Sequence, residues 1–287
     1  MTKKRLRLLA VVLLGFVAIL FWLARSPNEP TYQNRPLHAW LEDLKNWDGD
    51  TNAAAYIAFR EMGTNAIPSL LHVLESGDPR INRIIMKINQ KQSLVRLPFG
   101  RPWDYSMAAT WALYAMGTNA KPALPALAQM LLRTNNLICS ATVLAGIGAD
   151  AIPVLLTALT NQNDRIRHAA ISGMGWTRSD FDILVPALAA RLQETNRLVC
   201  CAAAISLGHL HAKPEIAVPA LTNAYSNADT LARSSILMSL GQFEGQAKAA
   251  VPTITSALKE SSQSVRESAA WAFQQIDPEG AASAGVR

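Results

Sequence analysis

Apolar residues recur three and four positions apart through most of this chain, and short polar segments separate the apolar stretches. Leu155 with Leu159, and Leu188 with Leu192, show the spacing, which predicts amphipathic helices. Each of these helices is followed by a polar turn and then by an alanine-rich helix. The turns read TNQND, QETN, SNADT and KESSQS, and the second helices include IRHAAISGMG and VCCAAAISLG. The pattern predicts helix pairs whose small residues let neighbouring helices approach closely.

The helix pairs repeat with a fixed step of 33 residues in the second half of the chain. Proline is expected at the start of each first helix, where its missing N–H is unpaired in any case. Glycine is expected to end each second helix, and Asp164 and Thr230 are reasonable N-caps. Four series keep the step: Pro153, Pro186, Pro219 and Pro252; Gly175, Gly208 and Gly241; Met174, Leu207, Leu240 and Phe273; and Arg167, Cys200, Arg233 and Arg266.

Earlier copies begin at Pro68 and Pro122, so the repetition extends toward the N-terminus. The phrases GTNAIP, GTNAKP and GADAIP mark one joint, at which one second helix ends and the next first helix begins. The joint has two lengths, with glycine either five or eleven residues before the proline. Because a single helix pair cannot bury its apolar face, the copies are expected to stack into an α-solenoid.

The segments LAGIGADAIPVLL and LGQFEGQAKAAVPTITSAL, followed by SVRESAAWAF, resemble HEAT repeats. More narrowly, they are similar to the short HEAT-like repeats first associated with phycobilisome lyases. The resemblance covers roughly residues 53–277, or about six units. It implies an all-α fold, an α-solenoid (α/α superhelix), and a protein-binding scaffold more often than an enzyme. It defines no catalytic residue, and the chain departs from it at Cys200 and between Pro68 and Pro122.

The N-terminus has the composition of a membrane segment. After the basic tip, residues 1–7, the run from Leu8 to Ala24 is uncharged and almost wholly apolar, and spanning helices need ~17–25 such residues. Bulky residues before Ala24 favour an uncleaved anchor over a signal peptide. The basic tip predicts a cytoplasmic N-terminus. We therefore expect a single-pass protein of the cytoplasmic membrane, with its repeat domain on the outer side.

The remaining boundaries follow from proline content and helical spacing. Residues 25–36 read as an extended linker with three prolines. Residues 37–52 contain Leu37, Trp40, Leu41 and Leu44 at helical spacing and are expected to form a capping helix over the first repeat. Docking of a partner is the alternative role for this segment. The repeats occupy 53–277, and 278–287 read as a flexible tail.

The interval from Pro68 to Pro122 is 21 residues longer than one repeat, and the excess lies within 81–106. Insertions in repeat arrays form loops on one face, which is often the binding face. Aromatic and arginine side chains are common interface anchors. The alternative is a loop that packs on its own repeat. The candidate partner-binding residues of the insertion are Arg96, Phe99, Arg101, Trp103 and Tyr105.

Arginines at one position of successive second helices form a further candidate surface. They could present a basic stripe to an acidic partner, or they could bond neighbouring acids and loop carbonyls along the stack. These residues are Arg167, Arg233 and Arg266, and Cys200 interrupts the series.

Composition narrows the chemistry. The charge of +6 is concentrated in residues 1–25, which hold five of the 27 basic and none of the 21 acidic residues, so the remainder carries 22 against 21. This near-neutral body disfavours nucleic acid as a partner. Cys139, Cys200 and Cys201 are expected to be small core residues more than reactive thiols. Two histidines at 209 and 211 do not make a metal site, and no hydrolase, redox or nucleotide motif is present.

The sequence thus favours a membrane-anchored, non-catalytic HEAT-repeat scaffold that binds an unknown protein partner and needs no cofactor. The alternative is a protein related to bilin lyases that binds or attaches a tetrapyrrole-type ligand.

Overall fold

The computed structural model describes residues 29–45, 49–76, 102–133 and 136–286. The chain divides into two compact units, Met1–Ala112 and Leu113–Arg287. Apart from one short hairpin, the regular elements of the described residues are helices. This helical, solenoid-like arrangement fits the α-solenoid that the repeats predict.

The first unit begins with a hairpin of β1 (Thr31–Tyr32) and β2 (Arg35–Pro36), paired antiparallel with Tyr32 opposite Arg35. Its turn residues Gln33 and Asn34 both have positive φ, as two-residue hairpin loops require. The linker predicted over 25–36 is therefore folded where the structure describes it. The helices that follow are α2 (Leu37–Lys45), α3 (Gly49–Met62), the 3-10 turn η1 (Gly63–Ala66), α4 (Ile67–Ser76) and the start of α6 (Pro102–Met116).

Helix α2 buries the four apolar residues that its spacing indicated, Leu37, Trp40, Leu41 and Leu44. The predicted capping segment, residues 37–52, corresponds to α2 and the beginning of α3, since a second helix starts at Gly49. Arg35 fixes the hairpin to α2 through Asp43 at 2.6 Å and lies 4.3 Å from the centre of the Trp40 ring.

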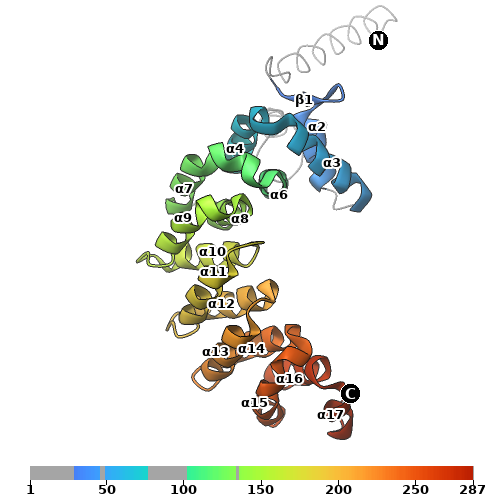
Figure 1. Ribbon diagram of the computed structural model, residues 1–287, viewed down its shortest axis with the longest axis vertical. Coiled ribbons are helices and arrows are strands. Elements are labelled where there is room, and N and C mark those ends of the chain that lie inside the picture. Colours follow the sequence, from blue (N-terminus) through green and yellow to red (C-terminus); the bar gives the residue numbers. More distant parts are fainter. Residues whose placement is uncertain (1–28, 46–48, 77–101, 134–135, 287) are drawn as a thin grey trace, which may run out of the picture. The chain divides into compact units, whose positions relative to one another are not determined.

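The second unit consists of helix pairs in two layers. The first helices are α7 (Leu124–Leu132), α9 (Ile152–Ala158), α11 (Phe181–Arg191), α13 (Pro214–Tyr225) and α15 (Val251–Ala257). The second helices are α8 (Leu137–Ile147), α10 (Asp164–Met174), α12 (Arg197–Leu210), α14 (Thr230–Gln242) and α16 (Gln263–Ile276). Each second helix packs against the next one, so α8 to α16 form a continuous layer (Figure 1). Buried leucine and alanine side chains fill the space between the layers.

The joints between pairs explain the two spacings seen in the sequence. After Gly63, Gly117 and Gly148, all with positive φ, the chain makes short 3-10 turns, of which η2 (Gly117–Ala123) and η3 (Ala149–Ala151) lie in the second unit. The fourth 3-10 segment is η4 (Glu244–Ala250). In the two longer joints that lead to α11 and α13, the first helix begins earlier, and Pro186 and Pro219 lie inside it. The prediction that every first helix begins at its proline is wrong for these two helices.

The glycine series likewise has two roles. Gly175 ends α10 as its C-cap, but Gly208 and Gly241 lie within α12 and α14, which continue to Leu210 and Gln242. A Cβ at Gly208 would lie 3.0 Å from Ser239 Cα, and one at Gly241 would lie 3.0 Å from Ala272 Cα. Glycine at these positions is required by the close approach of the next second helix. The helix caps fall one residue before the predicted ones, at Asn163 and Asp229, whose side chains accept backbone N–H bonds.

Two predictions about the ends of the chain need correction. No helix within 29–45, 49–76, 102–133 or 136–286 is long and apolar enough to span a membrane. This finding goes against the single-pass fold class and localisation derived from the sequence. Residues 8–24, on which those predictions rested, lie outside the described residues. At the other end, the predicted tail contains α17 (Pro278–Ser283), which packs on α16 and buries Ala281.

Candidate functional site

The arginine series forms a ladder along the turns between first and second helices. The Arg167 guanidinium donates to Asn161 O at 2.8 Å and to Gln162 O at 3.2 Å. Arg266 repeats this geometry with Glu260 O at 2.8 Å and Ser261 O at 2.6 Å. Arg233 donates to Ser226 O at 3.2 Å. The guanidinium groups thus satisfy loop carbonyls of their own repeats, as the bracing interpretation of the ladder predicts.

The ladder also joins consecutive repeats through acids. Arg167 reaches Glu194 of the following turn at 3.3 Å, and Arg233 contacts both carboxylate oxygens of Glu260 at 3.1 and 3.0 Å. Glu260 also accepts a hydrogen bond of 2.7 Å from the Tyr225 hydroxyl. Burial, followed by this bond to Glu260, raises the pKa of Tyr225. The guanidinium groups of the ladder are therefore already used in contacts within the stack. Partner binding by Arg167, Arg233 and Arg266 stays a prediction.

Of the other predicted partner-binding residues, Arg96, Phe99 and Arg101 lie outside the described residues. Trp103 belongs to α6, and nothing further is described of its side chain. Tyr105 is buried; its hydroxyl donates to Glu42, and Lys45 Nζ lies 3.9 Å from the centre of its ring. Tyr105 therefore packs inside the first unit against α2, which is the self-packing alternative for that end of the insertion.

The structure shows an apolar row that the sequence analysis missed. The row consists of large apolar side chains at two repeat positions of α12 and α14, which the 33-residue step relates in pairs. Their exposed fractions are 53% for Leu198, 43% for Ile205, 49% for Leu231 and 40% for Met238. Trp176 lies beside this row; it is 42% exposed, and its ring centre is 5.8 Å from that of His209 on α12. The sequence contains a trace of this row, because Leu198 and Leu231, and Ile205 and Met238, are each 33 residues apart.

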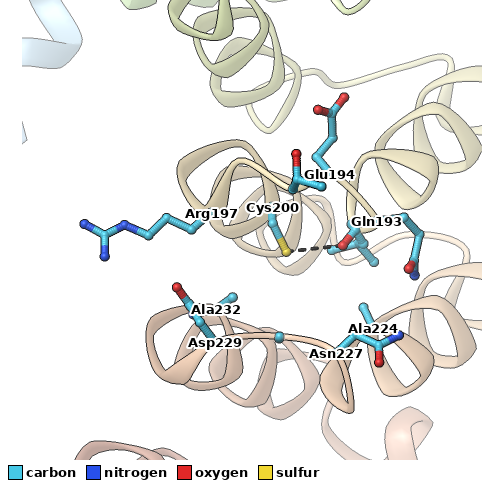
Figure 2. Close-up of a pocket in the computed structure, with 11 residues that line it drawn as sticks. Gln193, Glu194, Arg197, Cys200, Ala224, Asn227, Asp229 and Ala232 are labelled. Atoms are coloured by element: carbon cyan, nitrogen blue, oxygen red, sulfur yellow. Dashed lines mark hydrogen bonds between the residues drawn. The ribbon is translucent and has the colours of Figure 1, made fainter.

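Where Cys200 interrupts the ladder, a cavity of about 350 Å³ opens between the turns of two repeats. Figure 2 shows Cys200 on one side of it and Asn227, Asp229 and Ala232 on the other. The Cys200 thiol donates to Leu192 O at 3.3 Å. Burial, with smaller contributions from Cys201 and the Asp229 charge, raises the pKa of Cys200 to about 11. This thiol is therefore a poor nucleophile near neutral pH.

The other cysteines and histidines considered from the sequence pack against neighbouring residues. Cys139, Cys200 and Cys201 are not joined in disulfides, and all three are buried. The His211 ring packs edge-on against Phe243 at 5.3 Å between centres. Within the described part of the chain, no three His, Cys, Asp or Glu side chains gather as metal ligands would.

Comparison with known proteins gives a likeness to solved structures alone. No protein-family model and no curated protein matches it. Among solved structures it is similar to human deoxyhypusine hydroxylase in complex with glycerol, at 17% identity over 85% of this chain and 96% of that chain, with a TM-score of 0.39. A likeness at this level assigns no activity to the chain.

Proposed function

We propose that this chain is a non-catalytic HEAT-type repeat scaffold that binds another protein through the apolar row. The observation that carries the proposal is the exposure of Leu198, Ile205, Leu231 and Met238, each at least 40% accessible on adjacent second helices. Large apolar side chains exposed at matching positions of neighbouring helices are the kind of surface that marks a protein interaction site. The partner expected from this chemistry presents a complementary apolar stripe.

The repeat itself argues that the row serves binding more than folding. The buried positions of α12 and α14, such as Leu207 and Leu240, already fill the space between the layers. The exposed residues add nothing to that core, and burying apolar surface yields about 25 cal/mol per Å² only when something covers it. A partner that covers the four side chains would release this energy, and the rigid helices beneath them lose little entropy on binding.

The tetrapyrrole alternative gains nothing from the thiols, since all three are buried and the pKa of Cys200 is raised. It predicts that the purified protein carries a visible absorption band or takes up a bilin covalently. The scaffold proposal predicts neither.

A matched pair of double variants tests the proposal. Leu198→Ser with Leu231→Ser alters the row, whereas Ile183→Ser with Ile216→Ser alters two exposed isoleucines on the first helices α11 and α13, with the same 33-residue step. A photo-crosslinking residue placed at 205 or 238 reports on the partner. We expect one protein species to be crosslinked, to be lost with the row variant, and to persist with the first-helix variant.

Because Leu198 and Leu231 are 53% and 49% exposed, a partner can cover only about half of each side chain. Half of the roughly 1.5–3 kcal/mol for a fully buried leucine, taken twice, corresponds to a weakening by the row variant of about 10- to 100-fold. Equal capture by both variants, or capture that disappears equally in both, would overturn the proposal. Sedimentation of the purified protein identifies a second copy of this chain as the partner if the association is homotypic.

A further inference from the structure

The ladder has two kinds of rung. In a closed rung, an arginine on a second helix donates to carbonyls of the turn before it. These carbonyls lie six and five residues earlier for Arg167 and Arg266, and Arg233 reaches the carbonyl seven residues earlier. At the open rung the corresponding position is Cys200, and the corresponding carbonyls belong to Glu194 and Thr195. Both residues line the cavity. Among the described hydrogen bonds, none ends on either carbonyl.

The acid of the rung is replaced together with the arginine. Glu194 and Glu260 are the acids that Arg167 and Arg233 reach in the following turn. The residue at the same position for the open rung is Asn227, which also lines the cavity. The charged pair of the closed rungs is therefore a neutral Cys200 and Asn227 pair here. With this neutral pair no acid is left without its arginine at position 227, whereas loss of the arginine alone would leave an unpaired acid there.

The shape of the cavity also follows from this exchange. Small residues on its other wall, Ala224, Ala228 and Ala232, leave the volume of about 350 Å³ unfilled. The Asp229 carboxylate lies at its edge with one oxygen capping α14 through Ala232 N at 2.9 Å. Arg197 lines the rim, but its guanidinium points away from the cavity (Figure 2).

We propose that this cavity binds a guanidinium group, supplied by an arginine of the protein that covers the apolar row. In this respect the inference rests on the proposed function. The ligand takes the place of the missing ladder arginine: its N–H groups donate to the Glu194 and Thr195 carbonyls and to the Asn227 amide oxygen, and Asp229 supplies the opposite charge. Arg197 on the cavity rim directly precedes Leu198 of the row, so one partner segment reaches both.

The ligand chemistry follows from the acceptors. A planar group with five fixed N–H donors can bond several carbonyl and amide oxygens of one cavity at once, which a compact ammonium does less well. An anionic ligand would face the same carbonyl oxygens and the Asp229 charge. A urea group has the planar shape of a guanidinium but carries no charge and has fewer N–H donors. It therefore provides the matched comparison.

The experiment uses the full chain and small probes, so that it does not depend on the partner. N-acetyl-arginine methylamide is titrated and followed by backbone NMR shifts at residues 193–200 and 224–232, with N-acetyl-citrulline methylamide as the neutral control. We expect saturable shifts at these residues with the arginine probe and none with the citrulline probe at equal concentration. Free arginine in a third titration separates the sources: tighter binding than the blocked probe indicates a free guanidino compound, and equal or weaker binding indicates a protein side chain.

Three variants test the location. Cys200→Arg closes the rung and should abolish the shifts, and Ala228→Leu fills the cavity from the other wall if the arginine variant folds poorly. Asn227→Glu restores the acid of a closed rung with the cavity open and should tighten probe binding at least about tenfold, through a charge-assisted hydrogen bond.

Shifts that persist in both filled variants, or equal responses to arginine and citrulline, overturn the inference. The two proposals fail separately. Probe binding without crosslinking at the row removes the protein partner and leaves the guanidinium site, whereas crosslinking without probe binding removes the site and leaves the scaffold.

Discussion

Two rungs of the same ladder lie one repeat apart and are built differently. At the closed rung, Arg233 bridges Ser226 O and both oxygens of Glu260, and the Tyr225 hydroxyl donates to the same carboxylate. At the open rung, the Cys200 thiol makes one bond to Leu192 O and a cavity takes the place of the guanidinium. The helices on either side are continuous in both cases, since α12 packs on α14 and α14 packs on α16.

This difference shows that the ladder braces the turns while the glycines bring the second helices together. Gly208 and Gly241 allow the same close approach on the open and the closed side. The stack therefore tolerates the loss of one arginine and its acid, and the position becomes available for another role.

The largest effect is expected from opening a closed rung. Arg233→Ala leaves Glu260 with Tyr225 as its remaining partner and leaves Ser226 O without its guanidinium. Because the side chains of Arg233 and Glu260 are 30% and 26% exposed, water compensates part of the loss. We expect the free energy of unfolding to fall by about 2 kcal/mol, measured by chemical denaturation.

The control for this variant is Arg165→Ala, which removes an exposed arginine from α10. Surface changes of this kind usually stay within about 0.5 kcal/mol. If Arg233→Ala lowers the free energy of unfolding no more than Arg165→Ala does, the closed rung does not stabilise the fold. The two rungs would then not differ in stability.

A smaller effect is expected from Gly208, the glycine on the same helix as the open rung. In Gly208→Ala the new methyl group would lie 3.0 Å from Ser239 Cα, and backbone cannot yield as a side chain does. Overpacking costs about 1–3 kcal/mol, and the better helix propensity of alanine returns up to about 1 kcal/mol. A net loss of about 1 kcal/mol in thermal or chemical unfolding is the expected result.

Gly245→Ala provides the comparison, because nothing lies within 4 Å of a Cβ at that position. Gly208→Ala should also cost about as much as Gly241→Ala. A clearly smaller cost at Gly208 would mean that α12 and α14 pack loosely and that the cavity reflects a general gap between these repeats.

The sequence predicted the repeats well because its signal is redundant. Four residue series with a common period of 33 defined the helix pairs. The earlier starts of α11 and α13 were missed because proline usually marks the first turn of a helix. In these two repeats the longer joint adds helical residues before Pro186 and Pro219. The apolar row and Asn227 required knowledge of which repeat positions face solvent, because a period alone does not distinguish a buried series from an exposed one.

The effect that is smallest at neutral pH concerns the thiol of the open rung, and it appears only at alkaline pH. Burial raises the pKa of Cys200 to about 11 in the folded chain, whereas an unfolded thiol titrates near ~8.5. The folded state therefore holds this proton more tightly, and the stability that it contributes is complete below about pH 8.5 and is lost as the pH rises toward 11. Cys200→Ala removes the titrating group, so its unfolding free energy should decline less between pH 8.5 and 10.5 than that of the unaltered chain.

Cys139→Ala, which alters another buried thiol, controls for the loss of volume. An identical decline in the unaltered chain and in Cys200→Ala would show that water reaches the cavity and solvates the Cys200 thiolate. A cavity filled with water in this way would bind a guanidinium group only weakly.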